Sequence, residues 1–385
     1  MEQSPDLGPK SETPETPTHE PKPNPVSDFL NKEVSRRDAL KIGAATLLAA
    51  ANAVLFKSLL DKLGSNNRPQ TTPLPEESTQ SPEILKGGIE FGFNTHLDNE
   101  ASNMNLDLFK KCVEDLSSRK QEWIRFNLKG ETIPNQEVMS DFDKGLDFAK
   151  QKGLKVVLVT NPPDISNEEA IAESYIQLAK RFRGKVDVWQ IFNEANAHHF
   201  RDYSPRPQVT NDYLKDFSKV VGAASQAIKS VDGSAKTTVN LSAWVGDHRD
   251  VVAEGTNFFG SVKNDIDFVT LDLYPDGNQA EIAKYAGYIS SLKNEFGKDV
   301  MIGEIGWPTY ENGFTPQDQA KYMGDVMSAL NSGNVKPTAV LFYEWADEQG
   351  IGENAFGAND IYGNPKDNSS YQQLTQAMTP PTQQS

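Results

Sequence analysis

The stretch Lys155–Thr160, KVVLVT, decides the fold because it is an unbroken, mostly β-branched apolar run that ends on a polar residue. A helical pattern follows over Glu168–Phe182, and a second run of the same kind, Asp187–Phe192, begins 32 positions after the first. A buried strand, a helix and another buried strand at this spacing are typical of a βαβ unit, in which the two strands are parallel.

The same unit recurs on both sides of this stretch. Eight apolar runs occur from residue 89 onward, and their first residues lie 31 to 49 positions apart. The runs are Ile89–Asn94, Trp123–Leu128, Lys155–Thr160, Asp187–Phe192, Lys236–Leu241, Asp267–Leu273, Asp299–Ile305 and Thr338–Tyr343. Eight such units over about 290 residues predict an α/β fold, a single (β/α)8 TIM barrel over residues 87–375. A doubly wound open sheet is the competing fold, but no G-x-G-x-x-G loop follows the first run.

The chain before the barrel has a different composition. Residues 1–34 are rich in Pro, with almost no large apolar residue before Phe29, so we expect a disordered tail. Residues 35–60 have the order of an export signal, in which paired arginines precede an apolar run. Residues 61–86 are polar and Pro-containing and are interpreted as a linker, and residues 376–385 as a disordered C-terminal tail.

The heptad from Ser35 to Lys41, SRRDALK, resembles the twin-arginine export signal, and only Ala39 departs from its usual form. The resemblance implies export in the folded state to the periplasm, the cell surface or the medium. The apolar run Ile42–Phe56 is 15 residues long, whereas a membrane span needs about 20. Ala51-Asn52-Ala53 fits a cleavage site, and an uncleaved membrane anchor over residues 42–60 is the alternative.

Charge and cysteine content exclude several function classes. The net charge of -16 argues against nucleic acid and anionic membrane surfaces as partners. A single cysteine excludes an intrachain disulfide framework and multi-cysteine metal sites. His, Asp and Glu show no i, i+4 metal-binding spacing, so we expect no metal and no cofactor, and we expect a monomer.

The ends of the expected strands carry the chemistry, because a barrel directs them into one shared cavity. Glu194 and Glu304 each close an apolar run, and two carboxylates across a small cavity are typical of glycoside hydrolysis. Aromatic faces beside polar groups suit a sugar. The further sugar-binding candidates at run ends are Trp244, Trp307, Trp345, His96 and Glu344.

Two segments carry a resemblance to a known group of enzymes. Trp189–Asn196, WQIFNEAN, and Ile302–Thr309, IGEIGWPT, resemble the retaining glycoside hydrolases of clan A at their fourth and seventh strands. The first segment is similar to families 5 and 39, and the second to families 17 and 53. Asp272 stands where many family 5 members have His.

The resemblance implies a role for each matching residue. Glu194 would be the acid/base and Glu304 the nucleophile, kept ionised by Arg125 and Tyr274. Asn193 would contact the sugar 2-hydroxyl, and Trp345 would be the platform under the sugar. The implied activity is hydrolysis of O-glycosidic bonds in a β-linked poly- or oligosaccharide by double displacement.

Three alternatives stay open at this point. The first is a carbohydrate-binding pseudoenzyme on the cell surface. The second is a transglycosidase at the same site. The third is a lyase or isomerase that uses Glu304 as a proton-abstracting base.

Overall fold

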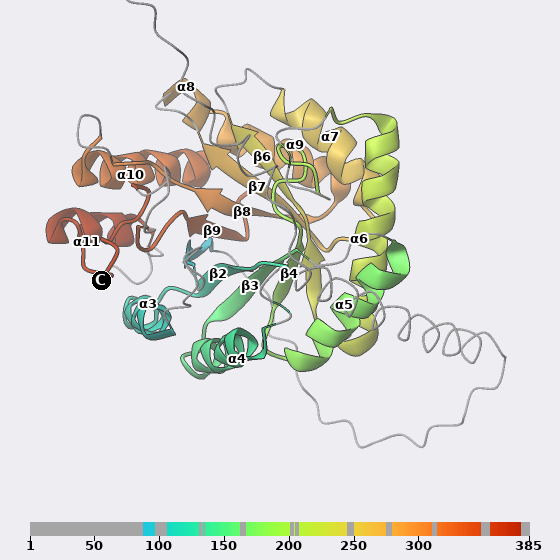
Figure 1. The fold of residues 1–385 in the computed structure, drawn as a ribbon. Helices are drawn as coiled ribbons and strands as arrows, with labels where there is room; N and C mark the ends of the chain where they lie inside the picture. The colour runs from blue at the N-terminus through green and yellow to red at the C-terminus, as the bar shows by residue number, and fades with distance from the viewer. Residues whose placement is uncertain are drawn as a thin grey trace, which may run out of the picture. The chain divides into compact units, whose positions relative to one another are not determined.

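The computed structural model describes residues 88–96, 106–130, 133, 135–161, 167–200, 204, 208–244, 250–274, 279–309, 314–347 and 355–378 (Figure 1). They all belong to one compact unit, Gln70–Ser385. The predicted tail 1–34, export signal 35–60 and linker 61–86 lie outside the described residues. No helix among the described residues is long and apolar enough to cross a membrane.

All strands of the barrel are parallel and belong to one sheet. They are β1 Glu90–Asn94, β2 Trp123–Leu128, β3 Lys155–Thr160, β4 Val188–Ile191, β5 Lys236–Thr238, β6 Asn240–Trp244, β7 Phe268–Tyr274, β8 Asp299–Ile305 and β9 Ala339–Phe342. Their order in the sheet is β5-β4-β3-β2-β1-β9-β8-β7-β6.

The two end strands of this order, β5 and β6, are halves of one interrupted strand. Only Val239 separates them in the sequence, and β5 pairs with β4 while β6 pairs with β7. The fifth strand of the barrel therefore joins both edges of the sheet. This arrangement confirms the predicted (β/α)8 barrel, in which β7, β8 and β9 are the sixth, seventh and eighth strands.

Helices alternate with the strands and surround the sheet (Figure 1). They are α3 Leu106–Ser118, α4 Gln136–Gln151, α5 Glu168–Arg181, α6 Asn211–Val231, α7 Val251–Val262, α8 Gln279–Ile282, α9 Tyr285–Phe296, α10 Pro316–Ser332 and α11 Asn368–Ala377. Side-chain caps fix the start of many of them, because a polar side chain satisfies a backbone N–H that the first turn leaves open. The capping residues are Asn135, Asn167, Thr210, Asp250, Thr315 and Asp367.

The last helix extends the barrel domain beyond the predicted end at residue 375. α11 reaches Ala377, and the following Met378 is fully buried in the core. Its carbonyl also accepts a hydrogen bond from Gln121 Nε2 at 3.4 Å. The tail predicted for 376–385 therefore begins inside this helix, and residues 379–385 lie outside the described residues.

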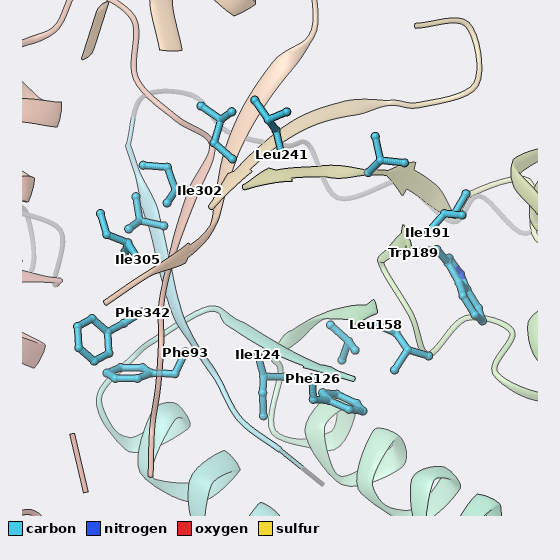
Figure 2. Packing of buried hydrophobic residues seen from close by; sticks show 14 of the residues in the cluster. Phe93, Ile124, Phe126, Leu158, Trp189, Ile191, Leu241, Ile302, Ile305 and Phe342 are labelled. Carbon is cyan, nitrogen blue, oxygen red and sulfur yellow. The ribbon is translucent and has the colours of Figure 1, made fainter. Parts of the chain in front are cut away.

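Alternation along each strand divides the core into two parts. One set of side chains faces the helices, and Phe93, Phe126, Leu158 and Trp189 belong to it (Figure 2). The opposite set forms a separate cluster inside the barrel, because successive side chains of a strand point to opposite faces. This inner cluster consists of Trp123, Val157, Val188, Phe268, Met301, Ala339 and Leu341.

Candidate active site

A polar layer lies above the apolar inner cluster, because the strands continue two residues beyond it. Arg125 follows Trp123 on β2, Gln190 follows Val188 on β4, and Tyr343 follows Leu341 after β9. The same period of two brings Asp272 into the barrel, four residues after Phe268 on β7. The carboxyl-terminal end of the barrel is therefore lined by side chains that can carry charge.

A bulge in β8 places Glu304 in this layer. Leu271 of β7 faces Ile302, but Asp272 faces Glu304, so Gly303 is an extra residue on β8. A Cβ atom on Gly303 would lie 2.7 Å from Thr270 Cγ2 and 2.8 Å from Asp272 Oδ1. Only glycine fits there, and the bulge re-aims Glu304 toward the cavity as bulges beside active sites commonly do.

Strong donors hold both oxygens of Glu304. Arg125 Nη1 donates to Oε1 at 2.7 Å, and the Tyr274 hydroxyl donates to Oε2 at 2.6 Å. Burial and the adjacent Glu304 raise the pKa of Tyr274 well above its usual value, so Tyr274 stays a phenol. A cation and a hydroxyl donor both favour the ionised form of a carboxyl group. The structure thus brings together three residues that the sequence predicted for one site.

Arg125 is itself fixed by a ring of amide oxygens. Its guanidinium is 2% exposed and donates to Asn94 Oδ1 at 2.5 Å, Gln190 Oε1 at 3.0 Å and Asn193 Oδ1 at 2.9 Å. Burial lowers the pKa of Arg125, but its acidic neighbours, Glu304 and Asp272 foremost, together outweigh burial and raise it above the usual value. Arg125 is a permanent cation with one fixed orientation.

The Asn193 amide also has one orientation. Its Oδ1 accepts hydrogen bonds from Arg125 Nη2 at 2.9 Å, Gln190 Nε2 at 3.0 Å and Asn240 Nδ2 at 3.0 Å. Because three donors converge on the oxygen, the amide NH2 group points away from them. Asn193 can therefore donate to a ligand while its oxygen stays occupied.

Glu194 lies on an unusual turn directly after β4. Phe192 and Glu194 have φ values of 63° and 45°, a region that residues other than glycine rarely adopt. The Glu194 backbone N–H donates to Asn240 Oδ1 at 2.8 Å, and the Tyr213 hydroxyl donates to the Ala195 carbonyl. These contacts hold the turn in a sparsely populated backbone conformation, and such conformations are concentrated at active sites.

The next residue but one completes the support of this turn. Asn196 Nδ2 donates to the Ser242 carbonyl and to Glu254 Oε1, both at 2.9 Å, and Asn196 Oδ1 accepts from Ser242 N at 2.9 Å. The Glu194 turn is thereby tied to β6 and to α7. Sequence patterns assigned no role to Asn240 or Asn196, because their importance comes from contacts between segments that are far apart in the sequence.

Three carboxyl groups meet in the cavity. One oxygen each of Glu194, Asp272 and Glu304 lies within 4.8 Å of the others, a grouping that could hold a cation. The prediction of no metal rested on spacing along the chain, which does not register residues from three different strands. Arg125 already supplies a positive charge to Glu304 at 2.7 Å. The expectation of a metal-free site remains a prediction.

The structure does not bring Trp345 to the carboxyl groups. Its side chain is 1% exposed, and its indole Nε1 donates to Asp115 Oδ2 of α3 at 3.0 Å. The ring also packs on Gly363, where a Cβ atom would lie 2.5 Å from Trp345 Cη2. β9 ends at Phe342, so the alternation that would have turned Trp345 inward does not continue.

Tyr343 occupies the inward-facing position two residues after Leu341. Its ring is centred 6.3 Å from the Tyr274 ring and 5.6 Å from the Phe356 ring. These three residues form a small aromatic cluster separate from the main core. Tyr343 ends the run Thr338–Tyr343, but the clan A resemblance implied the platform role for Trp345 instead.

The other sugar-binding candidates have different positions. His96 Nε2 pairs with Glu344 Oε2 at 3.2 Å, and the His96 ring lies edge-on to Tyr343 at 5.9 Å. Trp307 is buried in the core against Phe314. The backbone of Trp244 pairs with Tyr274 at the end of β6, and its side chain lies outside the described residues. His96 and Glu344 thus adjoin the aromatic cluster.

Comparisons with known proteins agree with this arrangement. The family model described as glycosyl hydrolase catalytic core matches residues 130–365. A search of curated proteins found no match.

Several solved structures are similar in fold. A family 5 glycoside hydrolase variant from Streptomyces cattleya in complex with Manβ1-4GlcNAc matches with a TM-score of 0.59 and 14% identity, over 75% of this chain and 80% of that one. A Thermotoga maritima β-glucosidase in complex with deoxynojirimycin gives a TM-score of 0.59 and 13% identity, over 77% and 99%. A family 39 glycoside hydrolase from Bacteroides cellulosilyticus has a TM-score of 0.55 and 16% sequence identity. The match covers 75% of this chain and 63% of that one.

At these identities the solved structures support the fold alone, whereas the family model covers more than half of the chain. Its match includes β4 through β9 and therefore both glutamates. The chain belongs to the glycosyl hydrolase catalytic core family and is a glycosidase that acts on O-glycosyl bonds.

Proposed function

We propose that this glycosidase cleaves a β-linked poly- or oligosaccharide with retention of configuration, with Glu304 as nucleophile and Glu194 as acid/base. The observation that carries the proposal is the pair of carboxyl groups at one end of the barrel, with oxygens within 4.8 Å. Retaining enzymes hold their two carboxyl groups about 5–5.5 Å apart, whereas inverting enzymes leave about 6.5–9.5 Å for a water molecule.

The surroundings of the two glutamates support this assignment of roles. Glu304 is buried and accepts hydrogen bonds from Arg125 and Tyr274. These donors stabilise the carboxylate that a nucleophile needs. Glu194 lies on the strained turn after β4, and its side chain is 15% exposed. An acid/base must reach both the departing oxygen and an incoming water, so the more exposed carboxyl group suits it.

In the first step a Glu304 oxygen forms a bond to the anomeric carbon while the glycosidic bond breaks. The Glu194 proton moves to the departing oxygen, so no alkoxide is released. In the second step Glu194 removes a proton from water, the water oxygen bonds to the anomeric carbon, and the Glu304 ester bond breaks. Glu194 regains its proton and Glu304 its charge.

Two further side chains orient the sugar in this proposal. The Asn193 NH2 group donates to the 2-hydroxyl, since its oxygen is held by three donors. Tyr343 takes the place of Trp345 as the aromatic platform, because its ring stands beside the Tyr274 ring. We extend a β-linked substrate to this chain, as part of the proposal, from two proteins that share its fold: a β-glucosidase and an enzyme in complex with Manβ1-4GlcNAc.

Azide rescue of two variants tests the roles. With an activated β-glycoside, Glu304→Ala is inactive and azide restores turnover with an α-glycosyl azide as product, since azide enters from the nucleophile side. In Glu194→Ala, azide attacks the glycosyl-enzyme instead and the product is the β-glycosyl azide. The reverse pairing of products would exchange the two roles. Sugar binding without turnover on β-glucan, mannan, xylan or galactan would favour the pseudoenzyme.

We also propose that the enzyme acts outside the cytoplasm. The support is the heptad Ser35–Lys41 with its paired arginines and the apolar run that follows. A single cysteine fits a protein that folds before export and needs no disulfide.

A further inference from the structure

Asp272 is the third carboxyl group of the site, and no role in the double displacement falls to it. It lies on β7 opposite Glu304 of β8, and its side chain is 0% exposed. Its Oδ2 accepts a hydrogen bond from Asn240 Nδ2. Its Oδ1 has no hydrogen-bond partner within the part of the chain that the structure describes.

Arg125 forms its ion pair with Glu304, and it acts on Asp272 only through its electric field. The hydrogen bonds of Arg125 go to Glu304, Asn94, Gln190 and Asn193. A buried carboxylate that has one amide donor and no paired cation is strongly disfavoured relative to its neutral acid. If Glu304 carries the charge that balances Arg125, an ionised Asp272 would leave a second, unbalanced negative charge in the barrel.

The charged and titratable groups that face Asp272 come from each surrounding strand. They are Glu304 on β8, Glu194 after β4, Arg125 on β2 and Tyr274 on β7, while Asn240 on β6 is uncharged. Burial raises the pKa of Asp272 well above its usual value, and the charge of Glu304 adds to the effect. Arg125 opposes this shift, and Glu194 reinforces it. The surroundings of Asp272 thus favour its neutral form.

Asp272 is also linked, through Asn240, to the two functional residues that follow β4, Asn193 and Glu194. Asn240 Nδ2 donates to Asp272 Oδ2 and to Asn193 Oδ1, and Asn240 Oδ1 accepts the Glu194 N–H at 2.8 Å. With both amide hydrogens of Asn240 engaged, its oxygen must face the Glu194 backbone. The Asn240 amide would be free to flip or move if Asp272 offered no acceptor.

We propose that Asp272 is an active-site carboxylic acid that stays neutral during turnover and acts as a positioning residue, holding Asn240 so that Asn240 holds Asn193 and Glu194. Oδ2 is occupied by the Asn240 donor, so the proton resides on Oδ1. The kinetic part of this inference rests on the proposed double displacement, but the proton on Asp272 does not.

Two variants separate a neutral acid from an anion. Asp272→Asn keeps the volume and an acceptor for Asn240 and is uncharged at every pH, whereas Asp272→Leu removes the acceptor. We expect kcat/KM of Asp272→Asn within about tenfold of wild type. We expect kcat/KM of Asp272→Leu to fall by about 100-fold or more, because Glu194 and Asn193 are no longer held in position. Equal losses in both variants, or no loss in either, would overturn the positioning role.

The pH profile supplies a readout that a purely structural role would not predict. If Asp272 is already neutral, Asp272→Asn leaves the alkaline limb of kcat/KM, which reports deprotonation of the acid/base, where it is in wild type. If Asp272 is an anion, its replacement removes a negative charge close to Glu194. The alkaline limb of kcat/KM then moves to lower pH by about one pH unit or more. Such a downward shift would contradict the proposal.

Infrared difference spectroscopy tests the proton without any need for activity. In Glu194→Gln at neutral pH, we expect a carboxylic-acid carbonyl band that is absent from the Glu194→Gln/Asp272→Asn double variant. All other buried acids cancel in this difference, and circular dichroism verifies that both proteins are folded. No difference band would show that Asp272 is ionised and would overturn the inference, even if the enzyme proved to be a retaining glycosidase.

Discussion

At the scale of single residues, the site depends on donors that hold one charge state and one orientation. Tyr274 donates to Glu304 Oε2 at 2.6 Å, and Arg125 donates to Oε1 at 2.7 Å. Sequence resemblance identified both residues because each matches a residue of the clan A pattern. It could not identify Asn240, whose importance comes from three simultaneous contacts that no local pattern encodes.

Replacing Tyr274 with Phe removes one of the two donors to the nucleophile and little else. We expect kcat/KM to fall by about 10²–10³-fold, as for the loss of one donor to a reacting oxygen. Tyr288→Phe is the matched control, because the hydroxyl of Tyr288 in α9 donates to Glu281 Oε2 of α8 at 3.1 Å, away from the site. An equal effect of both changes on steady-state kinetics would contradict the assignment.

Tyr343 and Trp345 give a second contrast at this scale. Tyr343→Leu removes the ring beside Tyr274 and should lower kcat/KM while the protein stays folded. Trp345→Phe removes the hydrogen bond from the indole to Asp115. It should lower the free energy of unfolding by about 1–3 kcal/mol, with activity retained. Urea unfolding and hydrolysis assays on both variants measure the two effects. The opposite pattern would restore Trp345 as the sugar platform.

At the scale of secondary-structure elements, the sequence predicted every strand of the barrel because buried parallel strands are continuous apolar runs. It did not predict the break at Val239 or the bulge at Gly303, since both depend on how neighbouring strands pair. The position of Trp345 follows from a similar irregularity, because β9 ends at Phe342 and the Trp345 indole turns to Asp115 of α3. The functional side chains follow from strand alternation only up to such irregular points.

Gly303→Ala tests the importance of the β8 bulge. The added methyl group would meet Thr270 Cγ2 at 2.7 Å and Asp272 Oδ1 at 2.8 Å. We expect a loss of about 1–3 kcal/mol of unfolding free energy from overpacking, together with a loss of activity as Glu304 shifts. Gly324→Ala in α10, where nothing lies within 4 Å of the added atom, should be neutral or stabilising. Thermal unfolding of the two variants gives the comparison, and an unaffected Gly303→Ala enzyme would refute the account of the bulge.

At the scale of the whole molecule, the barrel gathers residues that are far apart in the sequence. Glu194 and Glu304 are 110 positions apart, yet their oxygens lie within 4.8 Å. The fold class and the glycosidase activity could be predicted from run spacing and two motifs. The third carboxyl group of the cavity could not be assigned, because its charge state depends on burial and on which acid Arg125 pairs with.

Export is the prediction that belongs to the full-length chain. Replacing Arg36 and Arg37 together by Lys keeps the charge of the signal but removes the paired guanidinium groups. We expect glycosidase activity to accumulate in the cytoplasm of expressing cells instead of outside it. Activity assays of cell fractions check this result, and unchanged export would show that the heptad is not the signal.

Product stereochemistry tests the central claim most directly. Proton NMR of the first sugar released from a β-linked oligosaccharide distinguishes the anomers before they interconvert. Retention through a Glu304 glycosyl-enzyme predicts the β-anomer as the initial product. Initial formation of the α-anomer would show a single displacement by water and would contradict the proposed roles of Glu194 and Glu304.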